Sequence, residues 1–431
     1  MSSYLELERT LLLLCADLAI IIAAARFFGW LFGKVQQPPV VGEILAGVIL
    51  GPSLLGRLYP GAIQGLLTPK TTGVLSAIAQ VGLVLLMLLI GLEFPFDRLR
   101  HAARASTAVA LAGIVVPFAS SYWLAGWLYG LTPIQAPEFA FRLFFATAVS
   151  ITAIPIMGRI LMHTRLTRTR LGLTSITAAA VDDVLGWILL GAVVSMVTHG
   201  RADLATLVIS FVGVAILGFA FWALGRFGIS KLRVKRTESG GLPPGALAMV
   251  LVVVFASAAA TNALGVFSIF GGFLCGIAGS FHRGLAEAIR VSIGDLVSVL
   301  FLPIFFVFSG LRTDIGSLGS DPKLWLALGL VILVSCVSKF GATALAARAT
   351  GLPVKESLMI GLLMNTRALM ALVVINIGAD MGVISPAAFF WLVTMALFTT
   401  VITTPILLRA YPSPEAAGEW KDPVPHAGRA G

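Results

Sequence analysis

Apolar runs of about 20 residues recur along nearly the whole chain, and they constrain its fold more than any other feature. A run of this length crosses the hydrocarbon core of a bilayer as a helix, where every backbone polar group must be satisfied internally. Hydrophobic residues make up 58% of the 431 residues and charged residues 12%, against about half and about a quarter in soluble domains. The sequence therefore predicts an all-α, polytopic membrane protein.

The pattern predicts about thirteen transmembrane helices in a membrane transport domain that spans residues 1–411. They are expected at 10–32, 38–56, 73–94, 104–130, 141–161, 172–197, 204–227, 243–262, 265–280, 290–311, 323–349, 356–379 and 386–410. The first helix lacks a preceding basic region and a small-residue cleavage site, so we expect it to be retained. Prolines after Tyr411 predict that residues 412–431 form a disordered cytoplasmic tail.

The distribution of basic residues predicts the orientation in the membrane. Lys and Arg concentrate in the breaks after odd-numbered helices, most densely at residues 226–236. Because basic loops stay in the cytoplasm, the N-terminus is expected outside and the C-terminus inside, with a bacterial inner membrane as the expected location. The formal charge of +10 follows the same pattern, so it does not point to a nucleic-acid partner.

Two pairs of similar stretches indicate inverted repeats at about 38–197 and 265–410. AGVILG (Ala46–Gly51) resembles GGFLCG (Gly271–Gly276), and LIGLEFPFD (Leu89–Asp97) resembles FSGLRTD (Phe308–Asp314). The matched helices are an odd number apart, so the copies would cross the membrane in opposite senses. Inverted repeats are typical of transporters whose site lies where broken helices meet. Small-residue patterns that recur only for close packing are the alternative.

The same offset pairs two helices that carry polar residues in mid-span. In the fifth helix these are Thr147, Ser150, Thr152 and Pro155, and in the twelfth they are Asn365, Thr366, Arg367 and Asn376. Proline removes a backbone donor and frees carbonyls of the preceding turn. The sequence therefore predicts two discontinuous, crossing helices, with a simple proline kink and a snorkelling arginine as the alternative.

Asp182 and Asp183 lie side by side in the sixth apolar run. Each aspartate at a helix centre costs about 2.5–3.5 kcal/mol, which neighbouring Leu, Ile and Val residues recover only in part. Burial and mutual repulsion favour protonation of at least one carboxylate, whereas a bound cation favours ionisation. Proton and cation are thus expected to compete for Asp182 and Asp183, with oxygen atoms of Thr147, Ser150 and Thr152 as further ligands for Na⁺ or K⁺.

Three further charged residues accompany the aspartate pair. Lys339 lies deep in the eleventh apolar run, so it is expected to pair with Asp182 or Asp183, or else to snorkel to the cytoplasm. Glu43 and Glu93 occupy helix positions that are candidates for a domain boundary, where they would tune a pH response or merely pair with loop arginines.

Five motifs taken together resemble the monovalent cation/proton antiporter family, which includes Kef-type, NapA-type and plant cation/proton exchangers. They are PPVVGEILAGVILGPSLLG (Pro38–Gly56), GLVLLMLLIGLEF (Gly82–Phe94), AAAVDDVLGWILL (Ala178–Leu190), LPIFFVFSGLRTDI (Leu302–Ile315) and MNTRALMALVVINIGADMGVIS (Met364–Ser385). The similarity runs in order from about residue 38 to 405.

This resemblance implies a thirteen-helix homodimer in which a core domain slides against a dimerisation domain. It also implies that Asp183 is the ion-binding aspartate, Asp182 its partner and Lys339 the core lysine. The plant-type members, similar elsewhere, carry Asn–Asp where this chain has Asp182–Asp183. In the family the double aspartate accompanies electrogenic exchange and Asn–Asp electroneutral exchange, so the resemblance leaves the stoichiometry open.

The leading hypothesis is a secondary antiporter that exchanges Na⁺ or K⁺ for protons by alternating access. A sodium-coupled symporter of an organic anion and a non-transporting membrane sensor are the alternatives. The sequence shows no hydrolytic or redox constellation, so neither an enzyme nor a cofactor is expected.

Overall fold

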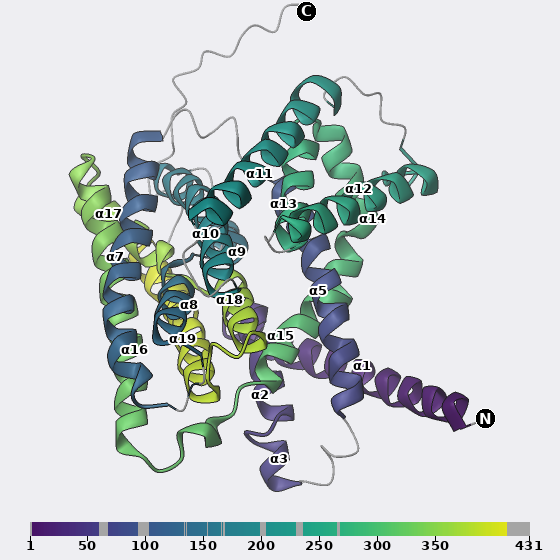
Figure 1. Cartoon of the computed structure of the whole chain (residues 1–431). Coiled ribbons are helices and arrows are strands. Elements are labelled where there is room, and N and C mark those ends of the chain that lie inside the picture. The colour runs from purple at the N-terminus through teal and green to yellow at the C-terminus, as the bar shows by residue number, and fades with distance from the viewer. Residues whose placement is uncertain are drawn as a thin grey trace, which may run out of the picture.

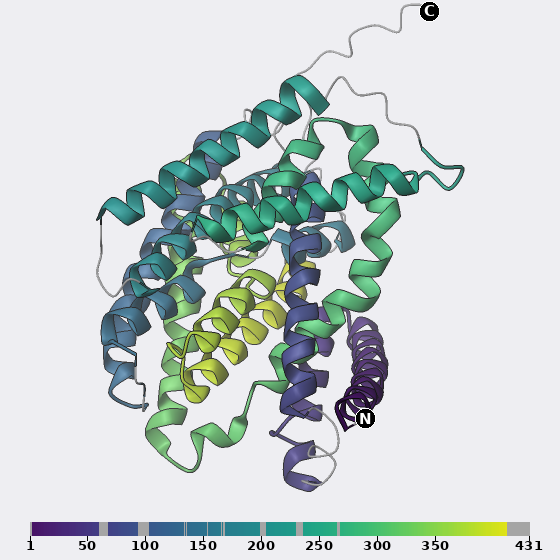
Figure 2. The same ribbon diagram turned by 45° about the vertical axis from the view of Figure 1, so that its right-hand side comes forward.

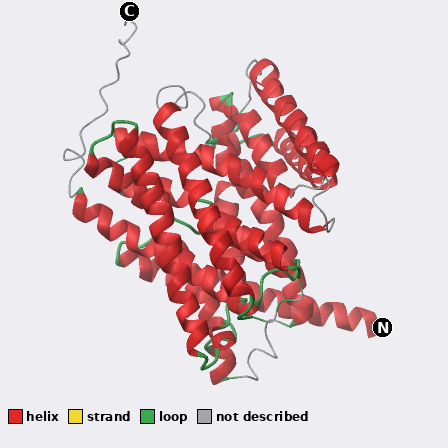
Figure 3. Ribbon diagram, turned by 60° about the vertical axis from the view of Figure 1, so that its left-hand side comes forward, coloured by secondary structure: helices red, strands yellow, loops and turns green. Residues whose placement is uncertain are grey.

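The computed structural model describes residues 2–59, 68–93, 103–132, 134, 136–152, 154–164, 166, 169–198, 204–229, 236–264 and 268–411. Every regular element in these ranges is a helix, as the all-α prediction requires (Figure 3). The predicted tail at 412–431 lies outside the described residues. The α-helices are α1 (Ser2–Lys34), α2 (Pro39–Leu50), α3 (Leu55–Leu58), α5 (Pro69–Leu92), α7 (Ala103–Tyr129), α8 (Glu138–Ser150), α9 (Ile154–His163), α10 (Arg170–Thr198), α11 (Leu204–Ala223), α12 (Pro244–Ala263), α13 (Ser268–Ser280), α14 (Arg283–Leu296), α15 (Leu302–Leu311), α16 (Pro322–Ala349), α17 (Val354–Met364), α18 (Leu369–Asp380) and α19 (Pro386–Ala410).

Each of the thirteen predicted segments contains helix, and two of them are split. The fifth is divided into α8 and α9, and the twelfth into α17 and α18. The tenth continues from α14 to α15 through one π-helical turn, η3 (Val297–Phe301). Ten helices in the described ranges are long and apolar enough to cross a membrane. These helices make the chain a multi-pass membrane protein.

Two predicted boundaries were wrong for local reasons. We expected the second helix to reach residue 56, but α2 ends at Leu50. Gly51 is extended there (ψ −167°) and precedes Pro52, which disfavours helical backbone in the residue before it. The tenth segment begins at Arg283 rather than at 290, because His282 Nδ1 accepts a hydrogen bond from Leu285 N (3.0 Å) and caps an earlier start.

Most of the helices form two bundles, which lie side by side in Figure 1 and are seen from another side in Figure 2. We call one the core bundle; it contains α7, α8, α9, α10, α16, α17, α18 and α19. We call the other the scaffold bundle; it contains α1, α2, α5, α12, α13, α14 and α15. Helix α11 contacts both of them, through α10 and α13. Within the core bundle, α7 packs on α8, α10 and α16, and α16 packs on α17 and α19. Within the scaffold bundle, α5 packs on α13 and α15, and α2 packs on α1 and α15.

Two close helix crossings, each built on a pair of facing glycines, hold the scaffold bundle together. A Cβ built on Gly47 of α2 would overlap Val307 O and lie 2.8 Å from the Cα of Gly310 on α15. Likewise, a Cβ on Gly276 of α13 would overlap Leu88 O and lie 2.7 Å from the Cα of Gly91 on α5. Small residues allow backbones to approach this closely inside a membrane. These four glycines lie in the four stretches that were paired from the sequence as inverted repeats.

The outer surface of both bundles is apolar. Large side chains such as Trp123 (77% exposed) and Leu345 (72%) in the core bundle, and Met249 (64%) in the scaffold bundle, point away from the protein interior. In a soluble protein such a surface would be an association site, but around a helix bundle of this hydropathy it suits contact with lipid chains.

Candidate functional site

The two interrupted helices meet at their breaks, as the sequence predicted. The backbone leaves helical geometry at Ile151 (φ −83°, ψ 141°), after α8, and at Ala368 (φ −158°, ψ −85°), before α18. Thr152 Oγ1, in the first break, donates a hydrogen bond to Met364 O, the last residue of α17 (3.0 Å). One orphaned helix-end carbonyl is thereby satisfied by a hydroxyl from the other break.

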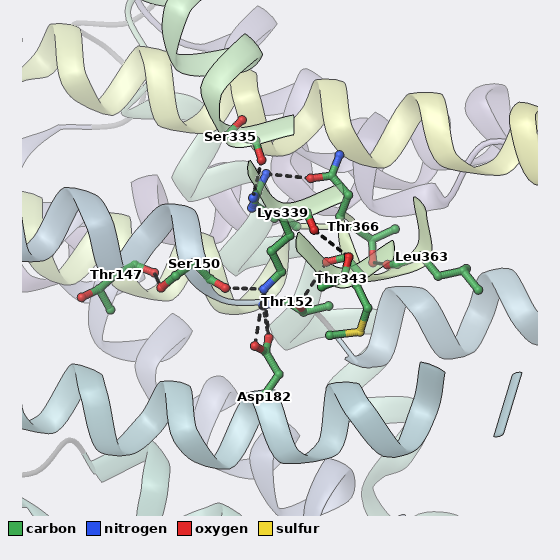
Figure 4. A network of polar contacts seen from close by, with 12 residues as sticks. Thr147, Ser150, Thr152, Asp182, Ser335, Lys339, Thr343, Leu363 and Thr366 are labelled. Carbon is green, nitrogen blue, oxygen red and sulfur yellow. Dashed lines mark hydrogen bonds and ion pairs between the residues drawn. The ribbon is translucent and has the colours of Figure 1, made fainter. Parts of the chain in front are cut away.

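Asp182 is the acceptor at the centre of this site (Figure 4). Its side chain is fully buried on α10, and its Oδ2 accepts the backbone N–H of Thr152 at 2.7 Å. Lys339 Nζ lies 3.3 Å from Oδ2 and 3.4 Å from Oδ1. The carboxylate of Asp182 is therefore held by a backbone donor that the first break frees and by a buried ammonium.

Lys339 does not snorkel. Its side chain on α16 is fully buried, and Nζ donates to Ser150 O as well as contacting Asp182. Ser150 is the last residue of α8, so its carbonyl is one that the break leaves without a helical partner. Of the two pairings that the sequence left open, the structure forms the one between Lys339 and Asp182.

Asp183 differs from its neighbour in having no partner at one oxygen. It is 2% exposed, and its Oδ1 is buried without a hydrogen bond to any described residue. Unpaired carboxylate oxygens are rare in protein interiors, because each forfeits the hydrogen bonds that water would give it. In the aspartate pair, the Asp182 carboxylate is thus bonded to the protein, whereas one oxygen of Asp183 has no hydrogen-bond partner among the described residues.

Two of the three hydroxyls expected to ligate a cation bond within their own helix. Thr147 Oγ1 donates to Leu143 O at 2.7 Å, and Ser150 Oγ donates to Thr147 O at 3.0 Å. Both residues are buried at the end of α8. A donating hydroxyl still carries acceptor lone pairs, so these bonds do not remove its oxygen from a ligand set.

Arg367 and Asn365 belong to the second break. The Arg367 guanidinium, fully buried, donates from Nη1 to Asn365 Oδ1 (3.1 Å) and from Nη2 to Ser335 O on α16 (3.0 Å). Nη1 also lies 3.4 Å from Met395 Sδ on α19. Arg367 therefore ties the break to two neighbouring helices of the core bundle and does not snorkel.

Glu43 and Glu93 both lie in or at the end of the scaffold bundle. Glu43 is half-buried on α2, and its Cγ lies close to Gly29 on α1. Glu93 follows α5 and pairs with Arg290 on α14 at 3.4 Å, where both side chains are largely exposed. Glu93 thus pairs with an arginine, but this arginine lies in a helix, whereas an arginine in a loop was expected from the sequence.

Comparison with known proteins identifies the family. The sequence model described as "Sodium/hydrogen exchanger, transmembrane" matches residues 21–410. The chain belongs to this family. Membership agrees with the expected resemblance to monovalent cation/proton antiporters and with the expectation of a transporter rather than an enzyme.

Two relatives illustrate how far this chain resembles other members of the family. It is 36% identical over 408 residues to the Na(+)/H(+) antiporter NhaS4 of Synechocystis, covering 94% of this chain and 98% of the relative. It is 35% identical over 407 residues to cation/H(+) antiporter 17 of Arabidopsis thaliana. That match covers 94% of this chain but only 49% of the plant protein, so the chain spans about half its length.

A solved structure shares the fold. The sodium proton antiporter MjNhaP1 from Methanocaldococcus jannaschii superposes with a TM-score of 0.64, covering 95% of this chain and 98% of MjNhaP1. The two sequences are 15% identical, so the likeness concerns the fold.

Sequence reasoning missed two features of this exchanger. Asp17, a carboxylate within α1, is 2% exposed, and its position inside an apolar run was a visible signal. Arg312, after α15, contacts Asn376 and Asp380 of α18. The motif around Arg312 was noticed, but no spacing in the sequence connects it to residues more than 60 positions away.

Proposed function

We propose that this protein is a secondary antiporter that exchanges Na⁺ or K⁺ for protons through the pair Asp182 and Asp183. The observation that carries the proposal is the buried, unpartnered Oδ1 of Asp183 beside an Asp182 carboxylate that is already engaged. A proton or a desolvated cation would each supply the missing partner. Because both compete for the same oxygen, binding one releases the other.

Lys339 would determine how many oxygen ligands are available to the cation, because its ammonium occupies several of them. In the structure its ammonium contacts both oxygens of Asp182 and the carbonyl of Ser150. When a cation enters beside Asp183, repulsion would displace the ammonium and free these acceptors together. The hydroxyls of Thr147 and Ser150, the Thr152 break and Asp182 would then complete an oxygen shell of the kind that hard cations prefer.

The core bundle and the scaffold bundle would be the two bodies that move against each other in alternating access. The site lies within the core bundle, on α10, α16 and the two breaks, while the scaffold bundle is closed by its glycine crossings. We propose that the core bundle moves against the scaffold bundle in a homodimer, with the N-terminus outside and the C-terminus in the cytoplasm of a bacterial inner membrane. The basic residues in the breaks after odd-numbered helices support this orientation.

The comparisons support the same chemistry. NhaS4 is named a sodium/proton antiporter, and the Arabidopsis relative a cation/proton antiporter. The aspartate pair favours two protons for one cation: one proton held by Asp183, and a second that Lys339 releases when the cation displaces it from Asp182. One net charge would then cross per cycle. Each such charge couples to the membrane potential with about 2.3 kcal/mol per 100 mV. Clamping the potential with valinomycin and potassium should then change the sodium gradient that the protein reaches at equilibrium.

The deciding test is proton flux in proteoliposomes of purified protein, with Na⁺, K⁺ or Li⁺ added in turn at several pH values. We expect cation-dependent flux that Asp183→Asn abolishes, because the amide cannot exchange a proton for a cation. Gel filtration and thermal unfolding would show that the variant is folded. Flux that persists in Asp183→Asn would remove Asp183 from the mechanism; cation uptake without proton countertransport would favour a symporter.

A further inference from the structure

A polar network outside the ion site fastens the two bundles to each other. Arg312, the residue that ends α15 in the scaffold bundle, forms an ion pair with Asp380, the last residue of α18 in the core bundle. Arg312 Nη1 also donates to Asn376 Oδ1 on α18 at 3.0 Å. These contacts join α15, which crosses α2, to α18. Helix α18 is the second half of an interrupted helix that forms part of the ion site.

The network continues on both sides of this ion pair. Asn376 Nδ2 donates to Ser309 Oγ on α15 at 2.8 Å and to Leu372 O in its own helix at 2.9 Å. The Arg312 guanidinium lies 5.3 Å from the centre of the Phe308 ring, within cation–π range. Ser309 and Arg312 thus face Asn376 and Asp380 through polar groups.

Other contacts between the bundles occur near the same end. The 3₁₀ turn η4 (Ile315–Leu318), which follows Arg312, packs on α19 of the core bundle, and α19 also touches α2. By the distribution of basic residues, this end faces the outside.

The internal repeat supplies a comparison within the same chain. In the matched stretches LIGLE and FSGLR, Glu93 occupies the place of Arg312, at the end of α5 and at the opposite side of the membrane. Glu93 does not reach across to the core bundle, because it pairs with Arg290 of α14 in its own scaffold bundle. Among the described residues the two equivalent helix ends therefore differ: Arg312 bonds to the core bundle, whereas the ion pair of Glu93 lies within the scaffold bundle.

From this difference we infer that Arg312, Asn376 and Asp380 form a latch that holds the outer end of the two bundles closed in one state of the transport cycle. The inference rests on the proposed function, because alternating access requires this end to open. Partly exposed ion pairs contribute little net free energy. A latch made of one can therefore open in every cycle, whereas the glycine crossings cannot.

The test replaces the reversible latch by a covalent one. In a background where the free cysteines Cys15, Cys275 and Cys336 are changed to alanine, Arg312→Cys with Asp380→Cys would be joined by a short bis-methanethiosulfonate cross-linker, because a direct disulfide cannot span the reach of the arginine side chain. We expect cation-dependent proton flux to fall at least tenfold on cross-linking and to return when reduction cleaves the linker. The matched control is Glu93→Cys with Arg290→Cys, a cross-link inside the scaffold bundle that should leave flux unchanged. Full flux from completely cross-linked Arg312→Cys/Asp380→Cys protein would overturn the latch.

A second measurement does not depend on transport. Spin labels at Leu54→Cys, beyond α2, and Pro386→Cys, at the start of α19, would report the distance between the bundles at this end. Arg312→Ala should enlarge the population at longer distances, and exchanging the charges with Arg312→Asp and Asp380→Arg should reduce it again. An unchanged distribution in Arg312→Ala would contradict the latch even if no cation supports flux, whereas absence of flux with an altered distribution would contradict only the proposed function.

Discussion

Two helix crossings in this molecule hold helices together by opposite kinds of contact, one between backbones and one between polar groups. At the scaffold crossing, α2 meets α15 through Gly47 and Gly310, where the two backbones are in direct contact. At the core crossing, a hydrogen bond from Thr152 to Met364 O joins the α8–α9 break to α17, and Asp182 and Lys339 bind the first break.

This difference indicates which contacts in the protein can rearrange. Backbone atoms in van der Waals contact leave no room for rearrangement, because any shift creates either a clash or a void. At the core crossing, hydrogen bonds from Thr152 and Lys339 can be exchanged for others without loss of packing. The glycine crossing is therefore suited to a part of the protein that stays rigid. The polar crossing is suited to a site that binds a proton and a cation in turn.

The largest effect is expected at the glycine crossing. Gly310→Val would place side-chain atoms against Ile44 O and the Cα of Gly47, both backbone atoms that cannot rotate away. We expect loss of the folded protein, measured as absence of a monodisperse peak in detergent. The matched control is Gly329→Val on α16, where no atom lies within 4 Å of an added Cβ. A normal melting temperature for Gly310→Val would show that the crossing is looser than its geometry indicates.

The next largest effect is expected at the polar crossing. Lys339→Ala would leave the buried Asp182 carboxylate without its countercharge, and removing one partner of a buried pair costs about 3–5 kcal/mol. Thermal unfolding in detergent would measure the loss. Lys339→Met combined with Asp182→Asn removes both charges and should recover most of it. If the double variant were no more stable than Lys339→Ala, the charge imbalance would not be the cause.

A smaller effect is expected where the two breaks touch. Thr152→Val removes the hydroxyl that donates to Met364 O, and hydrogen bonds between membrane helices are worth about 0.6–1.7 kcal/mol. The valine keeps the backbone N–H that Asp182 accepts. Thr399→Val, whose hydroxyl bonds only within α19, is the control and should change the unfolding temperature less. Equal effects from both variants would mean that the contact between the breaks adds no stability.

The sequence predicted the helices and both breaks because these depend on local patterns. Hydrophobic run length determines where a chain can cross a membrane. Pro155, in the first turn of α9, prevents that helix from continuing back through Ile151, and Asn365 lies directly after α17. The all-helical fold and the paired breaks were confirmed for these reasons.

Pairwise contacts across the fold were beyond sequence reasoning. Asp182 and Asp183 are neighbours of the same type, and only their different directions on α10 decide which one meets Lys339. Similarly, the hydroxyls of Thr147 and Ser150 were expected in a ligand set, but their orientation depends on competing carbonyls one helical turn away. The contact between Arg312 and Asp380 depends on how α15 and α18 approach, which no local pattern encodes.

The end of α8 at Ser150 has an electrostatic consequence. Peptide dipoles sum along a helix to about half an elementary charge, negative at the C-terminus, within its last turn. Both α8 and α17 end at the breaks, so two negative helix ends lie at this site, one against Lys339 and the other against Thr152. An ammonium and a desolvated monovalent cation are interchangeable in such a field. Under the proposed function, the lysine would occupy the place of the transported ion when that ion is absent, and the two helix termini would help to stabilise whichever positive charge is present.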